Sequence, residues 1–133
     1  MENKAHLGSL AFAAGVAALS MVPGGFAQQP IKAGDTLTGP LRLVRTTHPN
    51  GTRIEAYQIV SKPRAMPADD EFCPDGRAVR TFHLFARNAA IRQQLKPLLG
   101  RTISVKATEL FCSQTAWHIG DVAVTEWKLL TKQ

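Results

Sequence analysis

The chain has 133 residues, of which 44% are hydrophobic and 20% charged, and its formal net charge at pH 7 is +6. This length excludes an assembly of several large domains and predicts one small domain with a modest core. The basic excess favours acidic partners such as anionic glycans or an acidic protein. The lysines and arginines are scattered without runs, as is typical of a solvated surface, and nucleic acid is not an expected partner.

Residues 1–27 have the pattern of a signal peptide. A lysine precedes an apolar stretch at 7–22, and proline and glycine follow that stretch. Gly25 and Ala27 are the small residues that a cleavage site needs at its −3 and −1 positions. A retained membrane anchor is the alternative, but the apolar stretch is shorter than the roughly 20 residues of a spanning helix. We therefore expect a mature protein of residues 28–133, periplasmic or secreted, without a transmembrane segment.

The chain contains two cysteines, Cys73 and Cys112. In an exported protein an even number of cysteines predicts a disulfide. Closing a loop of about 40 residues contributes roughly 4 kcal/mol in the chain-entropy model. The alternatives are a catalytic thiol and a metal ligand, and either needs a reduced cysteine. We therefore expect these two cysteines to be bonded to each other.

The mature domain begins with two predicted strands. The first, over 36–44, alternates apolar and polar residues, and Pro40 predicts a strand edge or a bulge because it lacks a backbone donor. Asn50-Gly51 is a strong hairpin pattern, because both central residues of a type I′ turn need positive φ. The return strand follows over 53–60.

A long polar loop, Ser61–Gly76, precedes the third predicted strand. A loop of this length is either functional or tethered, and its Cys73 supplies a tether. The third strand, Ala78–Ala86, alternates, so that Phe82 and Val79 are expected on opposite faces.

The second half of the chain predicts one helix and two more strands. Asn88 is a good N-cap for a helix over 88–96. Strands are expected over 101–110 and 117–130, with a bulge at Gly120. Five strands with a single helix between the third and fourth predict an OB-fold-like barrel, mainly β. A β-sandwich, or an open sheet with one helix, is the alternative.

Two segments also resemble a known family. Leu98–Leu110, Leu-Leu-Gly-Arg-Thr-Ile-Ser-Val-Lys-Ala-Thr-Glu-Leu, is similar to a strand common in small exported bacterial OB-fold-like proteins. Thr115–Val122, Thr-Ala-Trp-His-Ile-Gly-Asp-Val, resembles the Thr-Ala-His-His-x-x-Asp-Val signature of the bacterial family called domain of unknown function 4431. Tyr57–Pro63 resembles an earlier strand of that family, which ends in proline. The sequence departs from the pattern at Trp117, where the family has the first of two histidines. The resemblance implies an exported β-rich module and no particular activity.

No enzyme motif is present in the sequence. The patterns His-Glu-x-x-His, Cys-x-x-Cys and Gly-x-Ser-x-Gly are absent. His118 and Asp121 flank Gly120, and we expect a structural hydrogen bond between them rather than a metal site. We therefore expect no catalytic residues, no metal and no cofactor.

Ligands of OB-folds bind on the face of the second and third strands and on the loops at its rim. Aromatic rings stack on sugars, and arginine binds acidic groups. One face of each strand must fill the barrel, so some of the aromatic and basic residues on these strands belong to the core. A tryptophan lies in the core more often than it serves as a ligand-binding surface. The candidate ligand-binding residues are Tyr57, Arg80, His83, Phe85, Trp117, His118 and Asp121.

These observations predict an exported binding or accessory module that recognises an acidic or sugar-like ligand or a partner protein. The alternative is an inhibitor or immunity-type protein that blocks an enzyme of the cell envelope, with the loop 61–76 as its inserting element. A sugar-binding subunit of an exported toxin is a third interpretation, and it requires a ring-shaped oligomer.

Overall fold

The computed structural model describes residues 30–67, 73 and 78–130. The predicted signal peptide and its cleavage site lie outside the described residues. Within the described ranges, no helix is long and apolar enough to cross a membrane.

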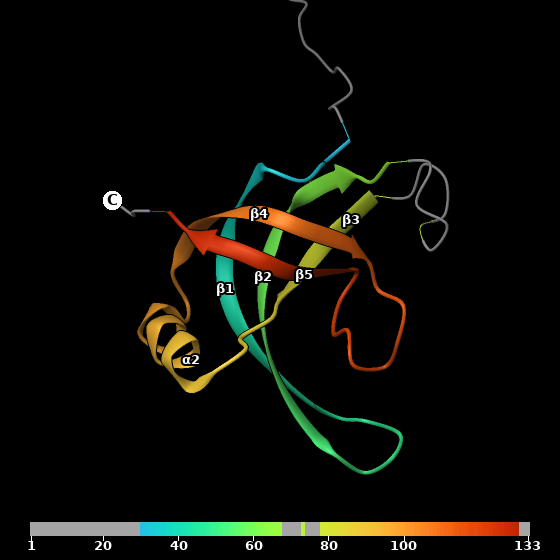
Figure 1. The fold of residues 1–133 in the computed structure, drawn as a ribbon, viewed down its shortest axis with the longest axis vertical. Helices are drawn as coiled ribbons and strands as arrows, with labels where there is room; N and C mark the ends of the chain where they lie inside the picture. The colour runs from blue at the N-terminus through green and yellow to red at the C-terminus, as the bar shows by residue number, and fades with distance from the viewer. Residues whose placement is uncertain (1–29, 68–72, 74–77, 131–133) are drawn as a thin grey trace, which may run out of the picture.

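Five strands form a closed barrel, and one short helix lies between the third and fourth strands (Figure 1). The strands pair in the order β1-β2-β3-β5-β4, and β4 pairs back to β1. Strands β3 and β5 run parallel, and all the other pairs are antiparallel. This topology confirms the predicted OB-fold-like barrel. The elements are β1 (Asp35–Thr47), β2 (Arg53–Ala65), β3 (Ala78–Leu84), α2 (Ala89–Leu95), a 3-10 turn (Lys96–Leu98), β4 (Thr102–Cys112) and β5 (Val122–Leu129).

Strand β1 changes its partner halfway along. Asp35–Pro40 pairs with β4, and Leu41–Thr47 pairs with β2. The proline predicted at an edge or bulge is thus the last residue in register with β4. The preceding Gly39 is buried, and a Cβ built on it would collide with the carbonyl oxygen of Val60. Glycine is therefore required where β1 crosses β2 closely.

The helix and the last strand differ in length from the prediction. Asn88 caps α2 as expected, because its Oδ1 accepts the backbone N–H of Ile91 at 2.9 Å. The last strand begins at Val122 rather than at Trp117, so this expected boundary is wrong. Residues 113–121 form a loop instead, because several of their backbone groups bond to β2 and β3.

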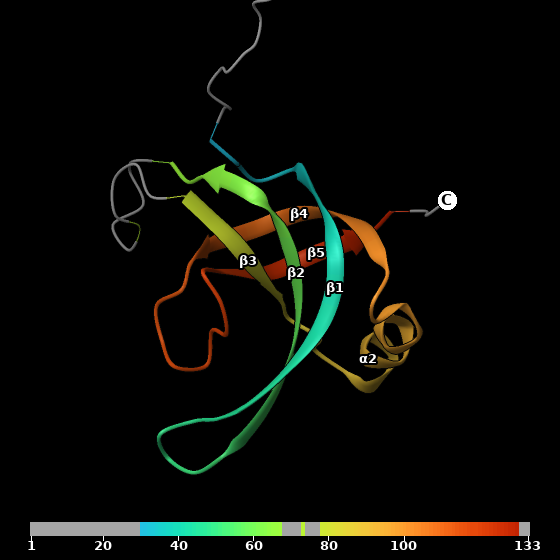
Figure 2. The same ribbon diagram turned by 180° about the vertical axis from the view of Figure 1, so that it is seen from behind.

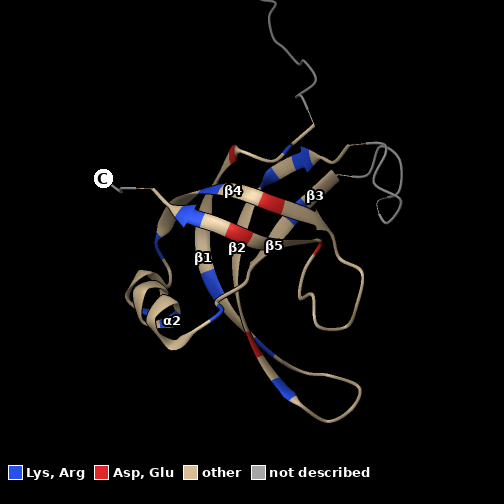
Figure 3. Ribbon diagram, in the orientation of Figure 1, with Lys and Arg blue, Asp and Glu red and all other residues tan. Residues whose placement is uncertain are grey.

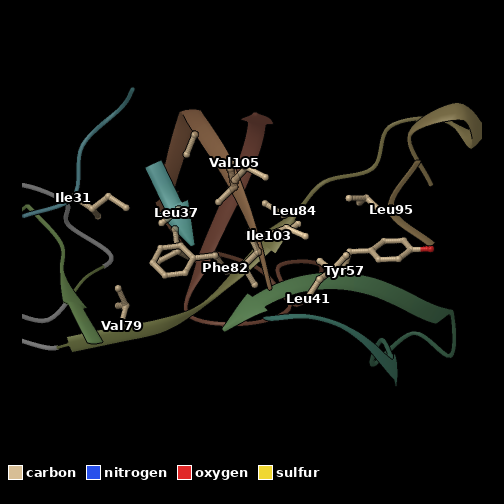
Figure 4. Close-up of a cluster of buried hydrophobic side chains, with 14 of the residues drawn as sticks. Ile31, Leu37, Leu41, Tyr57, Val79, Phe82, Leu84, Leu95, Ile103 and Val105 are labelled. Carbon is tan, nitrogen blue, oxygen red and sulfur yellow. The ribbon is translucent and has the colours of Figure 1, made fainter. Parts of the chain in front are cut away.

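The barrel interior is filled by apolar side chains from all five strands (Figure 4). Tyr57, a candidate ligand-binding residue, is only 7% exposed and lies in this core, so its ring is not available as a surface platform. Val79 also faces the core together with Phe82, contrary to the expected alternation. The register between β2 and β3 shifts between Val60 and Arg64, and this irregularity accounts for the burial of Val79 on the same face as Phe82.

The disulfide Cys73–Cys112 is formed, with 5.6 Å between the Cα atoms. It ties Cys73, in the β2–β3 connection, to the last residue of β4. The predicted pairing is confirmed. The expected loop boundary at residue 61 is wrong, because β2 continues to Ala65 and pairs there with β3; of the rest of the expected loop, residues 68–72 and 74–77 lie outside the described residues.

Candidate functional site

The loop between β4 and β5, residues 113–121, folds back over the outside of the barrel. The backbone N–H of Ile119 donates to Nδ1 of His83 at 3.0 Å, and Nε2 of Gln58 donates to the carbonyl oxygen of Ile119 at 2.5 Å. Gln58 and His83 stand on the outer face of β2 and β3, yet they are only 3% and 8% exposed. The β4–β5 loop therefore covers part of the face on which OB-folds bind ligands.

The covered residues form one row across the sheet. The register aligns Arg42 with Gln58, Gln58 with His83, and His83 with Ala123. Residues directly opposite in a sheet share a face. Nε of Arg42 donates to Oε1 of Gln58 at 2.9 Å, so Gln58 connects the exposed Arg42 to the backbone of Ile119. This chain of hydrogen bonds satisfies a buried amide and holds the loop down.

Asp121 anchors the second end of the loop. Its Oδ2 accepts the backbone N–H groups of Arg80 at 2.9 Å and Thr81 at 3.2 Å. Its own backbone N–H donates to Oγ1 of Thr81 at 2.8 Å. Gly120, just before it, has φ 132° and lies against Gln58 and Thr81, so a side chain there would be both strained and crowded. The carboxylate therefore shapes the loop through the backbone of β3. The expected hydrogen bond between His118 and Asp121 is wrong, because Nδ1 of His118 accepts the backbone N–H of Gln114 instead.

Two histidines meet two phenylalanines beneath the loop. The ring centroids are 4.5 Å apart for His83 and Phe85, 5.8 Å for Phe85 and His118, and 5.5 Å for Phe111 and His118. Burial lowers the pKa of His83 to about 4, and the charge of His118 adds to the effect. Burial also lowers the pKa of His118. Both rings are therefore neutral at pH 7.

The hydrogen bonds assign the tautomer of each neutral ring. Nδ1 of His83 accepts from Ile119, and Nδ1 of His118 accepts the backbone N–H of Gln114 at 2.9 Å. A neutral imidazole that accepts at Nδ1 carries its proton on Nε2. Neither ring then has a spare lone pair for a metal ion or for a proton from a substrate. In this arrangement the two histidines hold the loop in place.

Trp117 stands at the exposed tip of the same loop. Its side chain is 44% exposed, and among residues 30–67, 73 and 78–130 it is the one large hydrophobic residue classed as exposed. Its ring stacks on His48, with the centroids 3.8 Å apart and the planes 21° from parallel. The expectation that a tryptophan belongs to the core is wrong for Trp117.

The partner histidine belongs to the hairpin between β1 and β2. Its Nδ1 accepts the backbone N–H of Asn50 at 3.0 Å. The predicted hairpin is present, but the expected type I′ turn is wrong: Gly51 has a positive φ of 94°, whereas Asn50, like every other described non-glycine residue, does not. Figure 2 shows this hairpin and the β4–β5 loop projecting from the same side of the barrel. The stack of His48 on Trp117 joins their tips into one rim.

The structure brings together five of the seven candidate residues: His83, Phe85, Trp117, His118 and Asp121. Arg80 joins them only through its backbone N–H, and its side chain is exposed. His48, Gln58 and Arg42 were missed. A glutamine inside the apolar stretch 56–60 was an available signal, whereas nothing in the sequence pairs His48 with Trp117.

Fold and site together define a small OB-fold-like barrel whose rim carries a fixed aromatic pair. Comparisons with models of protein families, with curated proteins and with solved structures found no match. The resemblance to the family called domain of unknown function 4431 stays a prediction.

Proposed function

We propose that this protein is an exported binding module that holds an acidic, sugar-like ligand against Trp117 at the rim. The fixed orientation of the exposed Trp117 carries the proposal. A single exposed apolar side chain is ordinary on a folded surface, so its exposure alone indicates nothing. This indole, however, is held in one orientation by its stack on His48 and by a loop that is bonded to two strands.

A fixed aromatic ring is a good platform for a ring-shaped ligand. One face of Trp117 is occupied by His48, and its 44% exposure leaves surface for a sugar ring or another flat group. Because the loop is already ordered, binding does not have to bear the entropic cost of ordering it. The position also agrees with the rim loops that OB-folds use for ligands.

Arginines near the rim support an acidic ligand. Arg42, Arg53 and Arg80 are exposed, and each lies on a strand that is bonded to the β4–β5 loop or continues the hairpin. Figure 3 shows the basic positions on β1 and β2 toward this end. Arg45 is already paired with Glu55 at 3.0 Å. Guanidinium groups bind carboxylate and sulfate in a two-pronged geometry.

Export is part of the proposal and rests on two observations. The sequence of residues 1–27 has the pattern of a signal peptide, and the two cysteines form a disulfide, a bond typical of oxidising compartments. The inhibitor alternative needs an inserting loop at residues 61–76. Residues 61–65 belong to β2 instead, and residues 68–72 and 74–77 lie outside the described residues, so no observation favours this alternative.

A glycan array with the labelled protein and a Trp117→Ala variant tests the proposal. We expect acidic glycans to bind the wild-type protein, in a salt-dependent manner, and the variant to lose most of this signal. Stacking of one ring is worth about 1–3 kcal/mol, which corresponds to roughly a fivefold to hundredfold weaker Kd.

The matched control is Lys62→Gln, which removes a charge on an exposed residue of β2. It should bind like the wild type, and circular dichroism should show that all variants are folded. A folded Trp117→Ala variant with unchanged binding would refute the rim as the site. Absence of any glycan signal, together with stoichiometric retention of one envelope enzyme, would favour the inhibitor interpretation.

A further inference from the structure

One edge of β5 loses its strand partner halfway along. Strand β3 pairs with β5 as far as Leu84 and Val124, and the backbone N–H of Phe85 still donates to the carbonyl oxygen of Val124 at 3.0 Å. The chain that follows β3 then turns into α2 (Figure 1). Residues 125–129 of β5 therefore pair with β4 on one side and, within the described ranges, with no strand on the other.

The register of β4 and β5 shows which backbone groups face this edge. The backbone N–H of Leu130 donates to the carbonyl oxygen of Ser104 at 3.0 Å, so these residues form a hydrogen-bonded pair. Opposite residues in an antiparallel ladder alternate between hydrogen-bonded and non-hydrogen-bonded pairs. Leu129 and Trp127, one and three positions earlier, therefore form pairs of the second kind, and their N–H and C=O groups point away from β4.

These backbone groups have no backbone partner in the part of the chain that the structure describes. Just before them, Nη2 of Arg87 donates to the carbonyl oxygen of Thr125 at 2.8 Å and closes that part of the edge. A groove of about 630 Å³ lies along the rest, and Ile91 of α2 contributes to its far wall. Unpaired N–H and C=O groups along a strand edge are a template for a further strand.

The two faces of the β4–β5 ladder differ along this edge. Trp127 and Leu129 lie opposite buried residues of β4, so their side chains point to the inner, apolar face. Lys128 points to the outer face and lies opposite Lys106. A strand added to the edge would continue both faces. Its side chains would therefore alternate between an apolar and a charged environment.

The charged face favours an acidic strand. Among the described residues that line the groove, three are basic and one is acidic. The acidic residue, Glu126, lies 3.5 Å from Nη2 of Arg87. Lys106 and Lys128 have no acidic partner within 4 Å among residues 30–67, 73 and 78–130, and Figure 3 shows a basic position on each strand near the arrowhead of β5. A second copy of the chain, with its net charge of +6, would add to this positive charge, whereas an acidic segment would lower the repulsion.

We propose that the free edge of β5 binds an extended segment of an acidic partner protein as an additional strand. The main chain of the segment pairs with the N–H and C=O groups of Trp127 and Leu129. An acidic residue of the segment lies opposite Lys128, and apolar residues on either side of it enter the groove beside α2. This surface is separate from the proposed function at the rim, because neither Trp117 nor His48 lines the groove.

An NMR titration of the isotope-labelled protein with the end-capped peptide Thr-Val-Glu-Val-Thr tests the proposal. We expect the backbone amides of Trp127 and Leu129 to shift and to become protected from exchange. The amide of Lys128 already faces β4 and should keep its protection. The matched peptide Thr-Val-Lys-Val-Thr should bind at least tenfold more weakly, because its charge is reversed.

Two N-methylated peptides test whether the main chain pairs. One carries the methyl groups on both valines and the other on the glutamate, so each lacks a different set of N–H donors. The valine donors face β5 in an antiparallel arrangement and the glutamate donor faces it in a parallel one. At least one of the two peptides should therefore lose binding.

Protein variants test the two parts of the surface. The double variant Lys106→Gln with Lys128→Gln should raise the Kd of the glutamate peptide about tenfold, since each exposed charge contact contributes modestly. Leu129→Pro removes an N–H that faces the edge, a position where proline is tolerated in a sheet, and should weaken binding as well. Lys62→Gln and Trp117→Ala should leave the Kd unchanged.

Several results would overturn the inference. These are equal binding of the glutamate and lysine peptides, full binding of both N-methylated peptides, or an unchanged Kd in the folded double variant. Protection of the Trp127 and Leu129 amides in the protein alone would show that the edge is already occupied, by a second copy if the mass in solution is that of a dimer and by another segment of the chain if it is that of a monomer. Either occupant would refute the proposed partner.

Discussion

Acidification from pH 7 to pH 4 should detach the β4–β5 loop from the barrel. Nδ1 of His83 accepts the backbone N–H of Ile119 in the neutral state. A proton on this nitrogen would place two donors against each other, and the hydrogen bond would be lost. His118 has the same arrangement with Gln114, so both histidine contacts of the loop respond to acid in the same direction.

The magnitude follows from the lowered pKa of His83. In the unfolded or detached state the ring titrates near its ordinary 6.5, whereas in the folded protein its pKa is about 4. The unfolded chain therefore binds more protons between these values, and stability rises with pH. The contribution is fully present above pH 6.5 and is lost as the pH falls to about 4. A shift of this size corresponds to about 3 kcal/mol.

The assay is urea unfolding between pH 7 and pH 4, for the wild type and for His83→Asn. Asparagine offers Oδ1 near the position of Nδ1 and does not titrate, so the bond to Ile119 is kept. The difference in unfolding free energy between the two proteins should change by about 3 kcal/mol over this range, and carboxylate titration cancels in the difference. A lower protection of the Ile119 amide in acid, measured relative to the intrinsic exchange rate at the same pH, should accompany it in the wild type only. Parallel curves for the two proteins would refute the reasoning.

Three further predictions concern the barrel itself. Lys106→Glu converts a repulsive pair with Lys128 into an attractive one and should raise the unfolding free energy by about 0.5 kcal/mol; a less stable variant in urea would contradict this. Reduction of the disulfide should lower the unfolding free energy by about 3 to 4 kcal/mol, and an unchanged urea midpoint would argue against it. Gly39→Ala should cost about 2 kcal/mol, because its Cβ would meet the carbonyl oxygen of Val60; a wild-type melting temperature would show that the strands move apart freely.

The barrel was predictable because its signals are local. Alternating residues mark each strand, Asn88 caps the helix, and Asn50-Gly51 marks the position of the hairpin, although not its turn type. The disulfide followed from counting cysteines under the expectation of export. Each of these depends on neighbours in the sequence or on composition, and not on how distant segments pack.

The rim was predictable only in part. Trp117, His118 and Asp121 were identified as candidates, but His48 stacks on Trp117 through the meeting of two loops that no periodicity relates. Tyr57 was misplaced because an aromatic residue on a strand is equally consistent with the inside and the outside of a barrel. The register shift that buries Val79 likewise depends on pairing with β2.

The change of partner along β1 has a consequence for how the chain folds. Residues 35–40 can form their ladder only with β4, which is made much later during synthesis. The β1–β2 hairpin can assemble early, but residues 35–40 of its first strand stay unpaired until β4, which is distant in the sequence, has formed. Such non-local closure slows folding, and until it occurs the growing chain presents an unpaired stretch to its surroundings.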